Sequence, residues 1–541
     1  MTPTTPTHPA RAVLELRDLR IWFRTDDGAE NETVKGLSLG LAPGERLGLV
    51  GESGCGKTTT ILAALGLLPA NATVSGHVLY DGVDIIAGGD RTVRPHRWTD
   101  IAMVFQGAMS AFNPVHTVGW QITEALQVHR RFVGSEEARV QELLSLVGLP
   151  EGTEHRFPHE LSGGMKQRAV IAMALACEPK VLLADEPTTA LDVVVQDQIL
   201  RLLVELSERL GLALILVTHD LGVVAQSCTR AAVMRGGEIL EEGTVEQLYR
   251  SPAHPYTRTL FESTPDIAQV GARPRPEPAP ALLAVDGLSV EYPGRGATRR
   301  AVSDVSFQVA EGELVALVGQ SGCGKTTTLQ AVMGMLPGAS GSVLVDGAPA
   351  LGIRRAERRR LRERVQMIFQ DPYESLDVRF TVADTLEEPL LVFKVCRDRA
   401  ERRDRALAAL ESVGLTPAEQ YIDRYPHQLS GGQRQRVAIA AGLVLHPALL
   451  LADEPVSMLD VSVRTGVLQL LADLKERERM GILMITHDLS TAAEYADRII
   501  VMRDGRIVES GTPDEVVHRP GDPYTQLLID SIPSPDPART T

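Results

Sequence analysis

The stretch GESGCGKTTT at residues 51–60 returns almost unchanged as GQSGCGKTTT at residues 319–328. Both copies fit the pattern GxxxxGK[ST], in which a glycine-rich turn joins a strand to a helix and directs backbone amides at phosphate groups. An apolar, strand-like run precedes each copy, at residues 47–50 and 314–318. A chance glycine turn could explain one such copy, but it cannot reasonably explain two. The sequence therefore predicts two phosphate-binding loops.

Three further stretches repeat at the same interval as the loops. LSGGMKQR at 161–168 returns as LSGGQRQR at 429–436, LLADEP at 182–187 returns at 450–455, and VTHDL at 217–221 returns as ITHDL at 485–489; each second copy starts 268 residues after the first. Solenoid repeats run to about 20–50 residues, so this interval indicates two similar domains in tandem. Short apolar runs mixed with longer helical patterns predict α/β layering in each domain.

The domain boundaries follow from composition. We expect a first domain at residues 12–262, a proline-rich linker at 263–282 that contains GARPRPEPAPA, and a second domain at 283–533. Each domain ends in an extension with the element PYT, in SPAHPYTRTL at 251–260 and RPGDPYTQLL at 519–528. This duplication makes an ordinary proline turn an unlikely interpretation of PYT.

Composition excludes several classes of protein. The 541 residues carry 70 acidic and 55 basic side chains, a formal net charge of -15, which opposes broad nucleic-acid binding. Five scattered cysteines show neither a disulfide framework nor a zinc-like spacing. The basic run at 354–364 is interpreted as a solvated helix with mixed charge pairs. No run is interpreted as a membrane span, so work at a membrane would need spans from another chain.

Specific side chains in the loops suit triphosphate chemistry. Lys57 and Lys325 are expected to reach the outer phosphates, and the hydroxyls of Thr58 and Thr326 to bind Mg²⁺. The candidate loop residues are Gly51, Ser53, Gly54, Gly56, Lys57, Thr58 and Thr59 in the first copy, and Gly319, Ser321, Gly322, Gly324, Lys325, Thr326 and Thr327 in the second.

Paired carboxylates follow a second apolar run in each domain. Asp185 and Asp453 suit the metal, and Glu186 and Glu454 suit the general base. A lone DEP could equally be an exposed acidic turn, but its repetition after both loops favours catalysis. Two histidines, His219 and His487, each follow the glutamate by 33 residues, and this duplication favours a γ-phosphate contact over an ordinary hydrogen-bonding role.

With these motifs in place, both halves closely resemble the ATPase subunits of ATP-binding cassette (ABC) transporters. LSGGM at 161–165 and LSGGQ at 429–433 resemble the signature of that family. The resemblance implies two tandem P-loop NTPase domains, each with a RecA-like core, an antiparallel β subdomain and a helical signature subdomain. It also implies ATP hydrolysis with Mg²⁺, coupled to transport across a membrane.

The resemblance assigns further residues to the site. It identifies Gln106 and Gln370 as the glutamine loops, which contact Mg²⁺ and sense a membrane partner, and Asp192 and Asp460 as the D-loops. The signature residues implied to bind ATP are Ser162, Gly163, Gly164, Ser430, Gly431 and Gly432. The aromatic residues implied to stack on adenine are Phe23 and Tyr292, although a place in a strand core is a strong alternative for Phe23.

In the family, two cassettes pair head to tail. The resemblance implies one site with Lys57, Asp185, Glu186, His219 and Ser430, and another with Lys325, Asp453, Glu454, His487 and Ser162. Met165 stands where the signature usually has glutamine, and Met458 where alanine is usual, so we expect the two sites to have unequal kinetics.

The PYT extension resembles that of peptide and nickel importer ATPases. This implies two permease subunits and an extracytoplasmic solute-binding protein as partners, no nucleic acid, and a place on the cytoplasmic face of a bacterial membrane. Because no cysteine follows Cys396, no iron–sulfur cluster is expected. The alternatives are a soluble twin-cassette ATPase acting on ribosomes or DNA, and a fused sugar-importer ATPase, whose second half is commonly degenerate.

Overall fold

The computed structural model describes residues 12–25, 28–107, 111–129, 134–189, 191–271, 279–292, 299–371, 375–456, 459 and 461–539. These residues divide into two compact units, which are described separately. The first lies within Met1–Thr264 and Pro533–Thr541, and the second is Pro265–Ile532. The predicted D-loop residue Asp460 lies outside the described residues, as do Met458, which stands where alanine is usual, and most of the proline-rich stretch.

Two sheets form the frame of the first unit. A four-stranded sheet has the order β2-β1-β4-β5, with antiparallel neighbours, and a six-stranded sheet has the order β10-β9-β3-β8-β7-β6. Only β10 runs antiparallel to its neighbour in the larger sheet. The strands are β1 (Leu14–Arg24), β2 (Glu30–Leu41), β3 (Arg46–Val50), β4 (Ala72–Tyr80), β5 (Val83–Asp84), β6 (Ile101–Val104), β7 (Val181–Asp185), β8 (Ala213–Thr218), β9 (Arg230–Arg235) and β10 (Glu238–Thr244).

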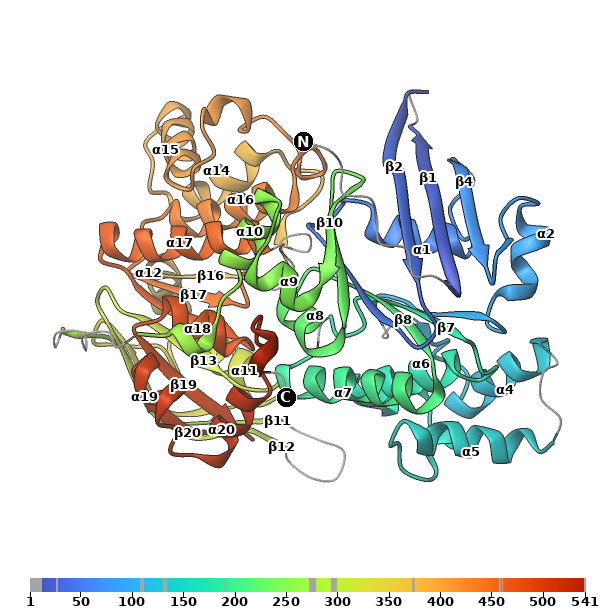
Figure 1. Ribbon diagram of the computed structural model, residues 1–541. Coiled ribbons are helices and arrows are strands. Elements are labelled where there is room, and N and C mark those ends of the chain that lie inside the picture. The colour runs from blue at the N-terminus through green and yellow to red at the C-terminus, as the bar shows by residue number, and fades with distance from the viewer. Residues whose placement is uncertain are drawn as a thin grey trace. The chain divides into compact units, whose positions relative to one another are not determined.

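The helices of the first unit fall into a core set and a separate helical group. Figure 1 shows β2, β1 and β4 side by side, and α4, α5 and α6 gathered together. The helices are α1 (Lys57–Ala64), α2 (Asp90–Val93), α4 (Val118–His129), α5 (Glu136–Leu146), α6 (Gly163–Ala174), α7 (Val193–Leu210), α8 (Leu221–Ser227), α9 (Val245–Arg250) and α10 (Pro255–Glu262). The expected subdivision into core, β subdomain and helical subdomain is confirmed.

The second unit repeats this plan. Its sheets have the orders β12-β11-β14-β15 and β16-β17-β18-β13-β19-β20. The strands are β11 (Ala281–Tyr292), β12 (Arg299–Ala310), β13 (Leu314–Val318), β14 (Ala339–Val345), β15 (Ala348–Pro349), β16 (Val365–Ile368), β17 (Leu449–Asp453), β18 (Gly481–Thr486), β19 (Arg498–Arg503) and β20 (Arg506–Gly511). The helices are α11 (Lys325–Val332), α12 (Arg355–Arg364), α14 (Val382–Phe393), α15 (Arg399–Ser412), α16 (Gly431–Leu443), α17 (Val461–Glu478), α18 (Leu489–Tyr495), α19 (Pro513–His518) and α20 (Pro523–Asp530).

The basic run near residue 360 folds as the helix that the sequence predicts. All of α12 except Leu361 is exposed or partly exposed, and Arg364 forms an ion pair of 2.6 Å with Asp346 outside the helix. Within the described residues, no helix combines the length and the apolar character that crossing a bilayer requires.

Strand order explains how distant motifs meet. The strands β3, β8, β7 and β6 are parallel neighbours, and their side chains are almost entirely buried. Such continuous apolar runs are typical of parallel strands whose two faces are both covered. The carboxyl ends of parallel strands lie along one edge of the sheet, where ligands bind in open α/β folds. The phosphate loop, His219 and Gln106 lie just after β3, β8 and β6, while Asp185 ends β7 and Glu186 follows it. The second unit repeats this arrangement with β13, β18, β17 and β16.

Candidate functional site

The phosphate loop of each unit runs from the end of a central strand to the start of a helix. α1 begins at Lys57 and α11 at Lys325, directly after Gly56 and Gly324, whose φ angles are 105° and 106°. The first glycine of each loop is also required, because a Cβ on Gly51 would lie 2.1 Å from the Met234 carbonyl oxygen. The amides at the start of the helix are therefore oriented as an anion site requires.

The loop lysines lie inside these turns. Lys57 Nζ donates hydrogen bonds to the carbonyl oxygens of Gly51 at 2.7 Å and Glu52 at 2.9 Å. Lys325 Nζ makes the same two contacts, with Gly319 at 2.5 Å and Gln320 at 2.9 Å. Both side chains are only 5% exposed, so each ammonium group is a fixed positive charge within its loop.

The first carboxylate of each pair lies against the loop threonine. Thr58 Oγ1 donates a hydrogen bond of 3.0 Å to Asp185, and Thr326 Oγ1 one of 3.3 Å to Asp453. Burial raises the pKa of Asp185 to about 6 and raises that of Asp453 in the same direction. A cation beside these carboxylates would offset that cost of burial.

These oxygen donors fit Mg²⁺, which proteins usually bind through one or two carboxylates together with substrate phosphates. No cluster of three or more His, Cys, Asp or Glu side chains that could hold a metal occurs in the described part of the chain. The donors would therefore be a threonine hydroxyl, one aspartate and a glutamine, with phosphate oxygens completing the set.

The second carboxylate of the first unit is surrounded by hydrogen-bond partners. The Glu186 carboxylate contacts His219 Nδ1 at 3.0 Å, Gln106 Nε2 at 2.9 Å and Thr189 Oγ1 at 2.9 Å. Burial opposes its ionisation, but the hydrogen bonds from His219 and Thr189 and the nearby Lys57 charge outweigh burial and lower its pKa. Glu186 is therefore ionised at neutral pH and can accept a proton.

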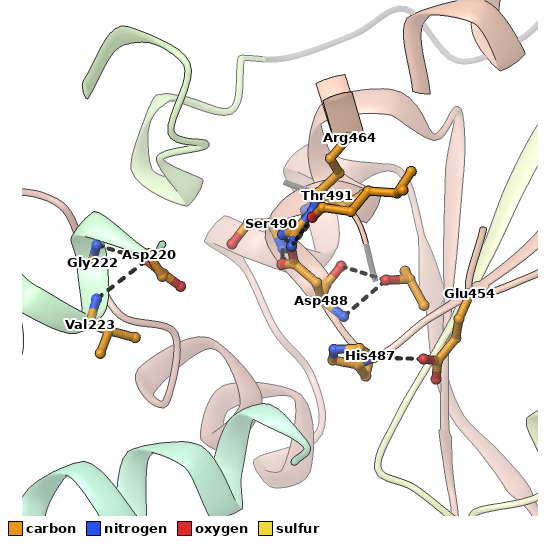
Figure 2. Close-up of polar contacts among 11 residues, drawn as sticks. Asp220, Gly222, Val223, Glu454, Arg464, His487, Asp488, Ser490 and Thr491 are labelled. Atoms are coloured by element: carbon orange, nitrogen blue, oxygen red, sulfur yellow. Dashed lines mark hydrogen bonds and ion pairs between the residues drawn. The ribbon is translucent and has the colours of Figure 1, made fainter. Parts of the chain in front are cut away.

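The second unit repeats this arrangement. Glu454 contacts His487 Nδ1 at 3.1 Å and Gln370 Nε2 at 3.0 Å, and its pKa is lowered despite burial, chiefly by His487. Burial of His487 opposes its protonation, but Glu454 and then Asp488 raise its pKa overall. Figure 2 shows His487 beside Glu454, and Asp488 capping the first amides of α18, which anchors the residue next to the histidine.

Backbone strain marks both glutamates. Glu186 has φ of 43° and Glu454 has φ of 46°, a left-handed conformation that non-glycine residues rarely adopt. The Glu186 N–H donates to the Val217 carbonyl at 2.9 Å, and Glu454 makes the equivalent bond to Ile485 at 3.0 Å. Such strain concentrates at functional sites.

One contact of this site was missed at the level of the sequence. Thr189 lies three residues after Glu186 and holds its carboxylate, yet a threonine in the run DEPTT has no distinctive spacing. Only the folded structure, in which the chain turns after β7, shows that Thr189 contacts Glu186.

The two aromatic candidates differ. Tyr292 is 38% exposed and lines a cavity of about 400 Å³ together with Lys325, Gln370 and Glu454. Loop residues Ser321, Gly322, Gly324, Thr326 and Thr327 also line it. In contrast, Phe23 is partly buried and packs against an apolar core that includes residues of both sheets of the first unit. Tyr292 therefore lies beside the second phosphate loop, whereas the core packing of Phe23 agrees with the alternative interpretation of that residue. Contact with adenine stays a prediction for both.

The signature motifs begin helices of the helical subdomains. Ser162 caps α6 and Ser430 caps α16, each accepting a hydrogen bond of 3.3 Å from the third helical residue. The glycines Gly163, Gly164, Gly431 and Gly432 form the first turns of these helices. Each serine therefore lies at a positive helix terminus, which suits contact with an anion. In the first unit, the D-loop residue Asp192 caps α7 through the Val195 N–H at 3.1 Å.

Family models match most of the chain. The model described as ABC transporter matches residues 34–189 and 302–457, which include both phosphate loops and both signatures. The model described as oligopeptide/dipeptide transporter, C-terminal region, matches residues 240–286 and 508–541, which include both PYT elements.

Similar proteins extend over nearly the whole chain. The glutathione import ATP-binding protein GsiA of Pectobacterium atrosepticum is 40% identical over 98% of this chain and 91% of its own length. The peptidoglycan transport ATP-binding protein YejF of Agrobacterium fabrum is 42% identical over 96% of each chain. The oligopeptide transport ATP-binding protein OppD of Mycobacterium tuberculosis is 38% identical over 97% of this chain and 99% of its own length. Two matched cassettes and full-length relatives of this kind place the chain in the family of ABC transporter ATP-binding proteins, the ATPases that drive transport across membranes.

Proposed function

We propose that this ATPase energises a bacterial importer of dipeptides, oligopeptides or related solutes such as glutathione and nickel complexes. The observation that carries the proposal is the duplicated C-terminal extension, which follows each cassette and matches the oligopeptide/dipeptide transporter region. The relatives described above are named for import or transport of glutathione, peptidoglycan and oligopeptides. These names favour transport over a factor acting on ribosomes or DNA.

The geometry supports a specific assignment of catalytic roles. An ionised Glu186 or Glu454 would orient and deprotonate the attacking water, and the histidine bonded to each would position the carboxylate and contact the γ-phosphate. The loop lysine would draw charge from the outer phosphates, and bound Mg²⁺ would neutralise charge on the phosphate oxygens. The protein would thus promote hydrolysis mainly by supplying fixed charges and by holding the reacting groups in position.

Two apolar surfaces beside the glutamine loops support a membrane partner. In the first unit, Leu67 and Phe105 are 40% and 42% exposed and line a cavity of about 250 Å³ with Trp98 and Met103. In the second unit, Phe369, which directly precedes Gln370, is 52% exposed, and Met335, at the position that corresponds to Leu67 in the repeat, is 47% exposed. We infer that each surface receives a segment of one permease subunit on the cytoplasmic face of the membrane, with an extracytoplasmic protein delivering the solute.

The decisive experiment is reconstitution. The chain would be co-purified with permeases encoded beside its gene, placed in lipid nanodiscs, and assayed for ATP hydrolysis with the solute-binding protein and a set of short peptides. We expect peptide-dependent stimulation that the exposed-surface variant Phe105→Ala weakens. Copurification with ribosomes, or stimulation by sugars and not by peptides, would contradict the proposal.

A further inference from the structure

The PYT element lies at the start of the last helix of each cassette region, far from the phosphate loop in sequence. Pro255 and Pro523 open α10 and α20, and the tyrosine follows directly. Tyr256 is 8% exposed and Tyr524 is 3% exposed, so both rings are buried. A buried tyrosine normally places its hydroxyl against a polar partner.

In the second unit, that partner is the phosphate loop itself. The hydroxyl of Tyr524 accepts a hydrogen bond of 3.0 Å from the N–H of Gln320, the second residue of GQSGCGKTTT. The carbonyl of the same residue accepts a hydrogen bond of 2.9 Å from Lys325 Nζ. Gln320 is therefore held by the tyrosine through its N–H and by the loop lysine through its carbonyl.

The tyrosine ring is fixed by the strand that supports the loop. The Arg503 guanidinium lies over the Tyr524 ring, 5.1 Å from its centroid. Arg503 follows Met502, whose carbonyl oxygen would be 2.2 Å from a Cβ on Gly319, the first glycine of the loop. The end of β19, the loop and the start of α20 thus form one packed layer.

In the first unit, Tyr256 has an arginine over its ring, as Tyr524 does, but its hydroxyl lacks the hydrogen bond to the phosphate loop. The Arg235 guanidinium lies 4.6 Å from the centroid of the Tyr256 ring. Burial, and then the Glu52 carboxylate, raise the pKa of Tyr256 to about 12, while the Glu52 N–H opposes this rise. That N–H does not meet hydrogen-bond geometry, and the hydroxyl of Tyr256 has no hydrogen-bond partner among the described residues.

We propose that Tyr524 is a positioning residue for the second ATP site, holding the phosphate loop through the Gln320 N–H, whereas Tyr256 supports the first loop without an equivalent hydrogen bond. The C-terminal extension is thereby part of each cassette's nucleotide machinery. This inference rests on the assignment of ATP to the Lys325 loop. Without the Tyr524 hydroxyl, the partly buried Gln320 N–H loses its acceptor. The peptide group between Gly319 and Gln320 is then held on one side only, by the Lys325 contact with the Gly319 carbonyl.

The test uses the full chain with Lys57→Ala, so that only the second loop binds nucleotide. In this background, Tyr524→Phe removes the hydroxyl and keeps the ring. We expect about threefold to tenfold increases in the Kd and KM for MgATP, measured by calorimetry and steady-state hydrolysis, with kcat within about twofold. The matched control is Tyr495→Phe, because the Tyr495 hydroxyl on α18 interacts with Glu494 and Thr465 and not with the loop.

Each possible result supports or refutes one stated part of the proposal. An unchanged Kd in Tyr524→Phe, while Lys325→Ala abolishes binding, would refute the positioning role and leave the ATP site intact. Failure of the Lys57→Ala chain to bind ATP at all would refute the site assignment instead. A lowered melting temperature with no selective rise in KM would indicate a merely structural role and refute the proposal. In a Lys325→Ala background, Tyr256→Phe should leave Kd within about twofold, and an equal loss there would refute the difference between the cassettes.

Discussion

The glutamate of each site combines strain, charge and hydrogen bonding. Glu186 and Glu454 share a left-handed backbone, a histidine partner and a glutamine partner, although the two copies lie in different units. Their pKa values stay low because these contacts and the nearby loop lysine outweigh burial. The neighbouring aspartates, which lack the histidine, have raised pKa values. Adjacent carboxylates thus have opposite pKa shifts because their surroundings differ, which agrees with the different roles proposed for them.

Removing the charge of the glutamates tests this assignment. Glu186→Gln and Glu454→Gln should each lower steady-state hydrolysis, and the double variant should lose at least about 100-fold in kcat, because general-base catalysis contributes about that much. The measurement is phosphate release at saturating MgATP. The surface variant Glu178→Gln, whose side chain is 77% exposed, is the control. Full activity in the double variant would remove the glutamates from the mechanism.

The two signature motifs differ in the hydrogen bonds that cap the first turns of their helices, α6 and α16. In α16, the Ser430 N–H donates a hydrogen bond of 3.0 Å to Gln433 Oε1, while the serine hydroxyl accepts one from the Gln433 N–H, so the two residues form a capping box. In α6, Met165 occupies the position of that glutamine and offers no such acceptor. The two signature helices therefore differ in how firmly their first turns are held.

The capping box predicts a measurable difference in hydrogen exchange between two variants of Gln433. Gln433→Met should expose the Ser430 amide to faster hydrogen exchange and destabilise the start of α16 by about 1 kcal/mol, the value of one intramolecular hydrogen bond. Gln433→Glu keeps the acceptor and should retain protection. Peptide-level hydrogen-exchange mass spectrometry over residues 429–436 provides the measurement, and equal exchange in both variants would contradict this account.

The second glycine of each signature is required for helix packing. A Cβ on Gly164 would lie 2.5 Å from Val195 Cγ1 on α7. A Cβ on Gly432 would lie at the same distance from Val463 Cγ1 on α17. Gly164→Ala should therefore destabilise the first unit by about 1–3 kcal/mol through overpacking. Val195→Ala should relieve part of that loss. A double-mutant cycle from urea unfolding measures the coupling, and simple additivity of the two changes would argue against a direct clash.

The duplicated architecture predicts two nucleotides per chain. Each unit has its own loop, lysine, aspartate and glutamate in the same order along its sheet. Titration calorimetry with MgATP on chains carrying Glu186→Gln and Glu454→Gln should give a stoichiometry of about two. Adding Lys57→Ala or Lys325→Ala should reduce it to about one, because a loop without its lysine loses the main charge on the outer phosphates. A stoichiometry of one without any lysine change would mean that one loop is inactive.

Much of this protein follows from local sequence, and the remainder depends on long-range packing. The loops, the carboxylate pairs and the histidines are recognisable because glycine turns, strand ends and a constant spacing of 268 residues are properties of short segments and of their order. Strand order, by contrast, depends on which buried faces pack together. Long-range packing also decides that Thr189 contacts Glu186 and that Tyr524 binds Gln320, 204 positions away. It likewise decides that Phe23 packs against the core whereas Tyr292 lines a cavity. Local chemistry specifies which groups can react, but only the packed core brings together groups that no sequence interval connects.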